Sequence, residues 1–302
     1  MVGMAGDTGR PVRRLHLNGV VLVATAMMLS GCSSGLPSLP FFSSSPDTKT
    51  AAPKPADELY NRADNLLSRG KYGGAAKRFE DVDREHPYSP YARRALALAA
   101  YAYYKDGNYA EAIKAGRRYT TLHSGTKDAA LAHHVIAMSY FDQISDPKRD
   151  QSKTKRALNE LNILIRRYPD SEYAKQARNR VRITRDILAA SEMNVGRYYM
   201  REGNQLAAIN RFKTVVTKFQ TTAHVEEALA RLTESYMALG IRNEAQTAAA
   251  VLGHNFPNSQ WYKDSYALLK SDGLAPREDQ SSWISRSWKK TVKSIQGVAT
   301  TH

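Results

Sequence analysis

Few residues in this sequence have a type and spacing that could do chemistry. The most ligand-like pair is His133-His134, but neighbours on a helix point about 100 degrees apart, and no HExxH or CxxC motif accompanies the pair. The sequence also contains no Gly-x-Ser-x-Gly elbow, no P-loop and no dinucleotide-binding glycine fingerprint. Its carboxylates are scattered among Lys and Arg, which is typical of solvated helix faces. We therefore expect no catalytic residue, no metal site and no cofactor.

The one motif that predicts a covalent modification surrounds Cys32. Three arginines precede an apolar run at 20–29 that is too short to cross a bilayer. The run ends in Leu29-Ser30-Gly31-Cys32, which resembles the bacterial lipobox at all four positions. We predict that residues 1–31 are a lipoprotein signal peptide and that Cys32 receives diacylglycerol and an N-acyl chain. As the only cysteine, it leaves the mature chain without an internal disulfide.

The segment after the lipobox predicts where the protein resides. Ser33 follows the cysteine, and in Gram-negative lipoprotein sorting an Asp at that position favours the inner membrane, so Ser33 is compatible with the outer membrane. Residues 32–55 are rich in Ser and Pro, a composition typical of a flexible tether. We expect a protein anchored by lipid in the cell outer membrane and facing the periplasm.

The formal charge of the 302-residue chain is +15, and most of it belongs to the mature protein. Such a surplus suggests nucleic acid as a partner, but the predicted export signal argues against it, so we expect no nucleic-acid binding. Anionic lipid headgroups, acidic protein surfaces and simple solubility remain open explanations.

From Ala56 onward, helical segments alternate with short Gly or Pro breaks, which predicts an all-α fold. The breaks recur in a pattern that resembles the tetratricopeptide repeat: a small residue, Gly, Ala, an aromatic residue and Pro. The first copy of this pattern consists of Ala63, Gly70, Ala75, Phe79 and Pro87. We predict five tetratricopeptide-like helical hairpins over residues 56–270, stacked as a right-handed superhelical solenoid.

The copies differ in ways that carry their own predictions. The second has Gly116 in place of the aromatic residue and Ser124 in place of Pro. The third carries a polar insertion at 145–152, in its inter-helix loop. The fourth is preceded by an unusually long helix that could begin near Glu172. The shared residue types serve packing, since small residues let helices approach and the aromatic wedges against the next hairpin.

The first helices of successive hairpins should line a groove. Aromatic rings beside positive charges would suit an extended peptide that ends in an aromatic residue and a carboxylate. Each of the tyrosines could equally belong to the core between repeats. The residues that the periodicity puts on or near this groove are Tyr60, Asp64, Leu67, Arg94, Tyr101, Tyr104, Lys105, His134, Met138 and Phe141.

Residues 271–302 form a tail of different composition. Trp283, Trp288 and Ile295 recur there at near-helical spacing, with lysines between them. Such a basic amphipathic segment could lie on a membrane surface, dock on a partner or on the last hairpin, or be disordered.

A lipobox, a tether and five such hairpins together resemble the BamD family of outer-membrane protein assembly factors. The stretches that carry the resemblance are 87–92 (PYSPYA), 100–105 (AYAYYK), 168–173 (YPDSEY), 195–199 (VGRYY) and 208–212 (AINRF). The sequence departs from the family pattern at His133-His134, at the insertion and in the tail.

The resemblance implies a non-enzymatic scaffold that joins the β-barrel insertase BamA and other assembly-complex lipoproteins. It implies that the N-terminal hairpins receive unfolded outer-membrane proteins and that the C-terminal hairpins dock a POTRA domain of the insertase, with Arg211 as a docking residue by position. A different tetratricopeptide lipoprotein, an adaptor for peptidoglycan enzymes or for pilus secretin assembly, would share the anchor and the solenoid.

Overall fold

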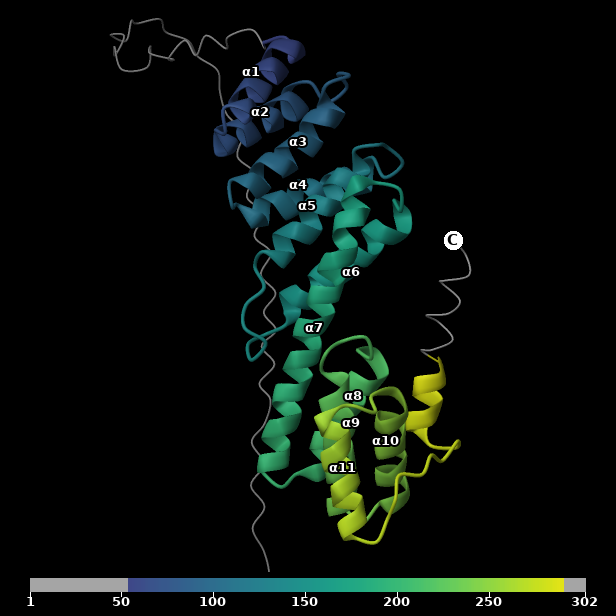
Figure 1. Ribbon diagram of the computed structural model, residues 1–302. Helices are drawn as coiled ribbons and strands as arrows, with labels where there is room; N and C mark the ends of the chain where they lie inside the picture. The colour runs from purple at the N-terminus through teal and green to yellow at the C-terminus, as the bar shows by residue number, and fades with distance from the viewer. Residues whose placement is uncertain (1–53, 291–302) are drawn as a thin grey trace, which may run out of the picture. The chain divides into compact units, whose positions relative to one another are not determined.

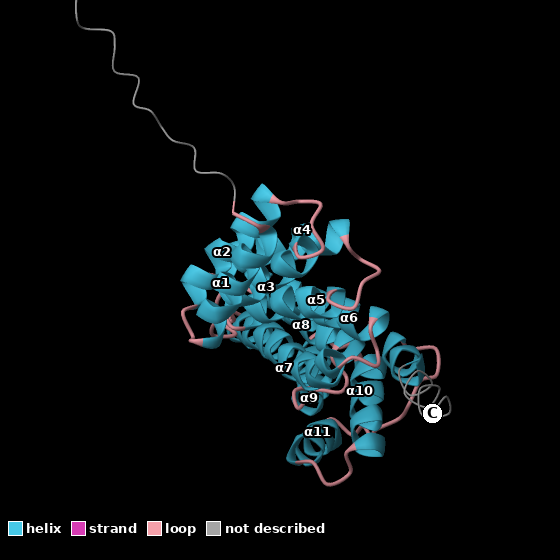
Figure 2. Ribbon diagram, turned by 90° about the horizontal axis from the view of Figure 1, so that it is seen from above, coloured by secondary structure: helices cyan, strands magenta, loops and turns pink. Residues whose placement is uncertain are grey.

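A computed structural model describes residues 54–290. The predicted signal peptide, Cys32 and all of the tether except its last two residues lie outside them. Between residues 54 and 290 the chain forms helices joined by loops and no strand (Figure 2), so the prediction of an all-α fold is confirmed. The helices are α1 (Ala56–Ser68), α2 (Tyr72–Glu85), α3 (Ala92–Lys105), α4 (Tyr109–Leu122), α5 (Ala129–Phe141), α6 (Ser152–Arg167), α7 (Glu172–Arg201), α8 (Gln205–Lys218), α9 (Val225–Ala238), α10 (Arg242–Asn255) and α11 (Gln260–Ser271).

Helices that follow one another in the chain pack against one another, from α1 to α10, as antiparallel neighbours in a repeat array do (Figure 1). The pairs α1/α2, α3/α4, α5/α6, α7/α8 and α9/α10 are the five predicted hairpins, and α11 follows against α9 and α10. Most turns inside hairpins use a glycine with positive φ, such as Gly203 at 73°. A side chain would strain that backbone, and glycine does not.

Helix α7 is the long helix that the sequence predicts, with 30 residues starting at Glu172. The Ser171 side chain caps it by accepting a hydrogen bond from the Ala174 backbone N–H. Its first half contributes Ala177 to a core with α5 and α6. Its second half contributes Leu188 to a separate core with α8, α9 and α10. One helix thus serves two cores.

Close helix approach explains the small residues of the repeat. On α7, Gly196 faces the Phe212 ring of α8, and a Cβ at Gly196 would overlap that ring. In the second hairpin, Gly116 faces Ile136 of α5 in the same way. The aromatic residue missing at that position is replaced one turn later by Tyr119, which is fully buried.

The segment after α11 folds back over the last two hairpins. A further helical segment begins at Trp283, whose indole N–H donates to the Tyr236 hydroxyl over 3.0 Å. Ile284 is fully buried in the core of α8 to α10. Of the three alternatives for the tail, docking on the last hairpin describes the part up to Lys290, and the residues beyond it are outside the described range.

Replacing Gly196 by Ala should destabilise the fold. The added Cβ collides with the Phe212 ring, and overpacking of this kind costs about 1 to 3 kcal/mol, which exceeds the gain of about 1 kcal/mol in helix propensity. Urea denaturation measures the difference. Gly74→Ala is the matched control, since its Cβ would lie 3.7 Å from Leu66, an ordinary contact. Equal stabilisation of both variants would contradict this packing.

Candidate peptide-binding groove

The predicted groove begins on α1 and α3, where an arginine lies between a tyrosine hydroxyl and an aspartate carboxylate. The Tyr60 ring packs 5.3 Å from the Tyr91 ring. Arg94 lies beside the Tyr60 hydroxyl, and its Nη1 lies 3.3 Å from Oδ1 of Asp128. These partners raise the pKa of Arg94, Tyr60 more than Asp128. The side chain of Arg94 is still 59% exposed, so its remaining donors can reach a ligand.

The surface continues across α5 and α7 through stacked rings. The rings of His134 and Tyr173 lie 4.8 Å apart. Burial lowers the pKa of His134 from 6.5 to about 4, and the positive charge of Arg180 adds to this effect. Burial raises the pKa of Tyr173, with further contributions from Tyr101 and Asp128. His134 is therefore a neutral, stacked ring at neutral pH.

The end of the groove nearest the C-termini of α3 and α5 is more polar. The Tyr104 hydroxyl donates to Oδ2 of Asp142 over 2.8 Å. Burial and this hydrogen bond raise the pKa of Tyr104 above its usual value. The Arg180 guanidinium lies 5.8 Å from the Phe141 ring centre, in cation–π range. The first helices α1, α3, α5 and α7 thus share a continuous row of aromatic and charged side chains.

Not all of the predicted groove residues belong to this row. Asp64 is exposed near Arg94, and Leu67 packs against the N-terminal core. Lys105 lies 5.8 Å over the Tyr72 ring of α2, at the edge of the row. The predicted residues that do belong to the row are Tyr60, Arg94, Tyr101, Tyr104, His134 and Phe141.

Met138 does not line the groove, because only 3% of its surface is exposed. The reason is the position of α5, which packs against α3, α4, α6 and α7. This leaves only Leu131, His134 and Phe141 of the helix partly exposed. Periodicity alone cannot reveal a helix that neighbours cover on almost every side.

Five residues of the row were missed by the sequence analysis: Tyr91, Asp128, Asp142, Tyr173 and Arg180. Two of them had a visible signal. Tyr91 and Tyr173 each stand four positions after a repeated proline and directly before a buried alanine, so a repeated tyrosine opens two of the groove helices. The two aspartates and Arg180 carry no such mark in the sequence.

The His133-His134 pair is split between two environments. His133 points into the core, where its Nδ1 lies 3.5 Å from Oε2 of the buried Glu160. Arg117 lies 3.4 Å from the other oxygen of the same carboxylate. Within the described range, no group of three His, Cys, Asp or Glu side chains could hold a metal ion.

Arg211 lies on α8, away from the groove. Its Nη1 lies 3.3 Å from Oε2 of Glu192 on α7, and its side chain is 45% exposed. Nearby on α7, Arg197 forms a two-pronged pair with Glu227 of α9, with both N–O distances 2.8 Å. Burial raises the pKa of Glu227, but Arg197 and Arg231 overcome this and lower it.

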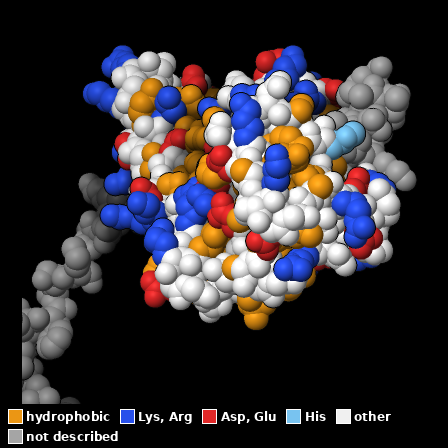
Figure 3. Space-filling model, turned by 60° about the horizontal axis from the view of Figure 1, so that its bottom comes forward, with side chains coloured by type: hydrophobic (Ala, Val, Ile, Leu, Met, Phe, Trp, Pro, Cys, Tyr) orange, Lys and Arg blue, Asp and Glu red, His pale blue; other side chains and the backbone are white. Residues whose placement is uncertain are grey.

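The positive charge of the protein is distributed rather than gathered into one stripe on the face shown in Figure 3, where Lys and Arg are interspersed with acidic and hydrophobic side chains. Nucleic-acid binding typically uses a clustered basic stripe. None of the helices described between residues 54 and 290 has the length and apolar character needed to cross a membrane.

Comparison with known proteins identifies the family of this chain. The family model described as "YfiO: Outer membrane lipoprotein" matches residues 52–252. The outer membrane protein assembly factor BamD of Caulobacter vibrioides is 44% identical over 223 residues, covering 74% of this chain and 73% of the relative. The chain belongs to the BamD family. BamD of Rickettsia prowazekii is 38% identical over 217 residues, covering 72% of this chain and 86% of the relative.

A more distant BamD, that of Xylella fastidiosa, is 28% identical over 261 residues and spans 82% of this chain and 85% of its own length. Membership of the BamD family confirms the resemblance predicted from the sequence. It also confirms the expectation of a protein that is not an enzyme, because the BamD relatives are assembly factors.

Replacing His134 by Phe should reduce the loss of stability in acid. The folded pKa of about 4 lies below the ordinary 6.5, so the unfolded chain binds the proton first as pH falls between these values. Protonation of His134 should lower the free energy of unfolding of the parent protein by at most about 3 kcal/mol in this window. Phe keeps a ring against Tyr173 but binds no proton. Unfolding curves of both proteins, measured at about pH 7 and about pH 4, give the change in unfolding free energy across this window.

The control for this experiment is replacement of the exposed His254 by Phe, which should leave the acid dependence of the parent protein in place. If the His134 variant loses as much stability in acid as the parent, the conclusion that this ring is buried and neutral is wrong.

Proposed function

We propose that this chain is a lipid-anchored scaffold of the outer-membrane β-barrel assembly machinery. In this role it receives segments of unfolded outer-membrane proteins in the groove of its first helices and docks a BamA-like insertase through a POTRA domain. Membership of the BamD family supports the general role. The observation that carries the receptor part is the continuous row of rings and cations from Tyr60 on α1 to Arg180 on α7.

The row offers what an extended peptide with an aromatic residue and a free carboxylate requires. A guanidinium binds a carboxylate through two parallel hydrogen bonds, and Arg94 keeps most of its side chain exposed beside Asp128. The rings of Tyr60 and Tyr91 lie next to it and provide an apolar surface for an aromatic side chain. Tyrosine loses little conformational entropy on binding, because it has only two side-chain torsions.

Replacing Arg94 by Gln should weaken binding of a peptide that ends in phenylalanine with a free carboxylate by about tenfold, because a charge-assisted hydrogen bond is lost. Fluorescence anisotropy with a labelled peptide measures the dissociation constant. The same peptide with an amidated C-terminus should bind the parent protein as weakly as the free peptide binds the variant.

Arg167→Gln on α6 is the matched control, since Arg167 is exposed on a second helix outside the row. A comparable loss of affinity in both variants would mean that overall charge, and not the groove, holds the peptide.

The docking part of the proposal rests on the half-exposed Arg211 of α8. Its pair with Glu192 joins two helices of one hairpin, and an exposed pair of this kind is worth at most about 1 kcal/mol. The guanidinium can therefore exchange this partner for a carboxylate of the POTRA domain at little cost.

Arg211→Glu should weaken binding to an isolated POTRA domain about fivefold or more, since it removes one attraction and adds a repulsion. The double variant with Arg211→Glu and Glu192→Arg restores the pair between α7 and α8 with its charges exchanged. It should bind as weakly as the single variant if Arg211 contacts the partner. Recovery of the parent affinity would show that Arg211 only stabilises the hairpin.

The anchor part of the proposal rests on the lipobox and lies outside the described residues. Cys32→Ala, exported with an ordinary signal peptide, should appear in the soluble periplasmic fraction, because the chain then lacks its acyl chains. Fractionation and immunoblotting measure this. Full retention in the membrane fraction would assign the anchoring to a protein partner or to another segment.

A further inference from the structure

We propose that a cavity between the α5–α6 loop and the second half of α7 binds an acidic segment of a partner protein. The cavity measures about 560 Å³, a size typical of ligand sites. Its residues belong neither to the groove nor to the Arg211–Glu192 pair, so this proposal goes beyond the function proposed above. Its polar lining includes Lys148, Arg149, Asn194, Arg197, Tyr198 and Arg201.

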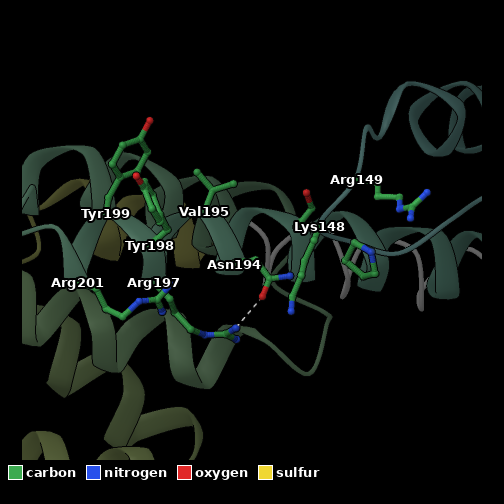
Figure 4. A pocket seen from close by; sticks show the side chains of 10 residues that line it. Lys148, Arg149, Asn194, Val195, Arg197, Tyr198, Tyr199 and Arg201 are labelled. Atoms are coloured by element: carbon green, nitrogen blue, oxygen red, sulfur yellow. Dashed lines mark hydrogen bonds between the residues drawn. The ribbon is translucent and has the colours of Figure 1, made fainter.

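Two elements supply the cations of this cavity. The polar insertion of the third hairpin provides Lys148 and Arg149, and one face of α7 provides Arg197 and Arg201 at a spacing of four residues. In Figure 4 the side chains of Lys148 and Arg197 extend toward Asn194 from the loop and from α7, whereas Arg149 points away from α7. Arg197 donates to the Asn194 amide oxygen over 3.0 Å.

Most of these cations have no acidic partner. Arg197 is paired with Glu227, but neither Lys148, Arg149 nor Arg201 forms an ion pair within the described range. The aspartates of the insertion are engaged in its own turns. Asp146 accepts from the Lys148 backbone N–H over 2.7 Å, and Asp150 accepts from the Ser152 backbone N–H over 3.1 Å. Neither aspartate lines the cavity, and no other acidic side chain is among its lining residues, so positive charge exceeds negative charge on its walls.

A second hollow of about 380 Å³ shares Arg197 and Arg201 with the first. The second hollow adds Met200 and Arg231, and Arg231 lies 5.1 Å over the Trp261 ring.

The walls favour a peptide over a phosphate headgroup. Pro147, Val195, Tyr198 and Tyr199 give the first hollow apolar surface beside its cations. A peptide with apolar side chains between its carboxylates uses both features, while a headgroup uses only the charges.

The test uses a short fluorescein-labelled peptide of alternating glutamate and leucine, with fluorescence anisotropy and the lipid-free mature chain. The parent protein should bind this peptide, and a peptide with glutamine in place of glutamate should bind about tenfold more weakly. The double variant Lys148→Gln and Arg201→Gln should lose affinity by a similar factor. These side chains are exposed and form no ion pair in the described structure, so the substitutions should leave unfolding unchanged.

The matched control is Arg242→Gln with Lys263→Gln, which removes the same charge from exposed positions elsewhere. The control should bind like the parent, and Arg94→Gln should bind the acidic peptide normally, which separates this site from the groove. Equal losses in both double variants would overturn the proposal, as would absence of binding to the parent. Binding of anionic phospholipid vesicles that depends on Lys148 and Arg201, without peptide binding, would assign the cavity to lipid instead.

Discussion

Each hairpin of this chain has two apolar faces and can bury only one of them within itself. The second face must pack against the next hairpin, and the fold depends on that requirement. Small residues allow this approach, as where Gly116 of α4 meets Ile136 of α5 in the next hairpin, and they also close a single hairpin, as where Gly196 of α7 meets the Phe212 ring of α8. After the last hairpin, α11 and the segment that contains Ile284 cover the face that a further hairpin would otherwise bury.

Helix α7 carries residues of both binding surfaces that we propose. Because it has 30 residues, its first half packs with α5 and α6 and its second half with α8 to α10. Tyr173 and Arg180 on the first half complete the row of rings and cations on the first helices. Arg197 and Arg201 on the second half line the basic cavity. The two proposed surfaces therefore differ in chemistry and share one helix.

Charge at these surfaces is organised by burial and by partners rather than by the net surplus of +15. Glu227 is held as a carboxylate by Arg197 and Arg231 against the effect of its burial. His134 is held neutral by burial and by Arg180. Cations that lack such partners, among them Lys148 and Arg201, mark the place where an outside carboxylate gains most.

The sequence by itself determined the all-α fold, the five hairpins and the family, but it did not distinguish α11 from the fifth hairpin, which ends at Asn255. These depend on local periodicity and on turn residues such as Gly203, whose positive φ requires glycine. It also identified six members of the groove row, because first-helix positions recur at a fixed interval. Tyr91 and Tyr173 could have been added from their repeated place after a proline.

Only the tertiary structure decided which helix faces remain open. Met138 has the same spacing as exposed neighbours, but four helices surround α5 and bury it. Asp128 forms an ion pair with Arg94 of the preceding hairpin. Lys148, from the α5–α6 loop, lines the same cavity as Arg197 of α7, although the two residues are far apart in sequence. Exposure and charge pairing depend on which elements meet in space, and local sequence patterns do not contain that information.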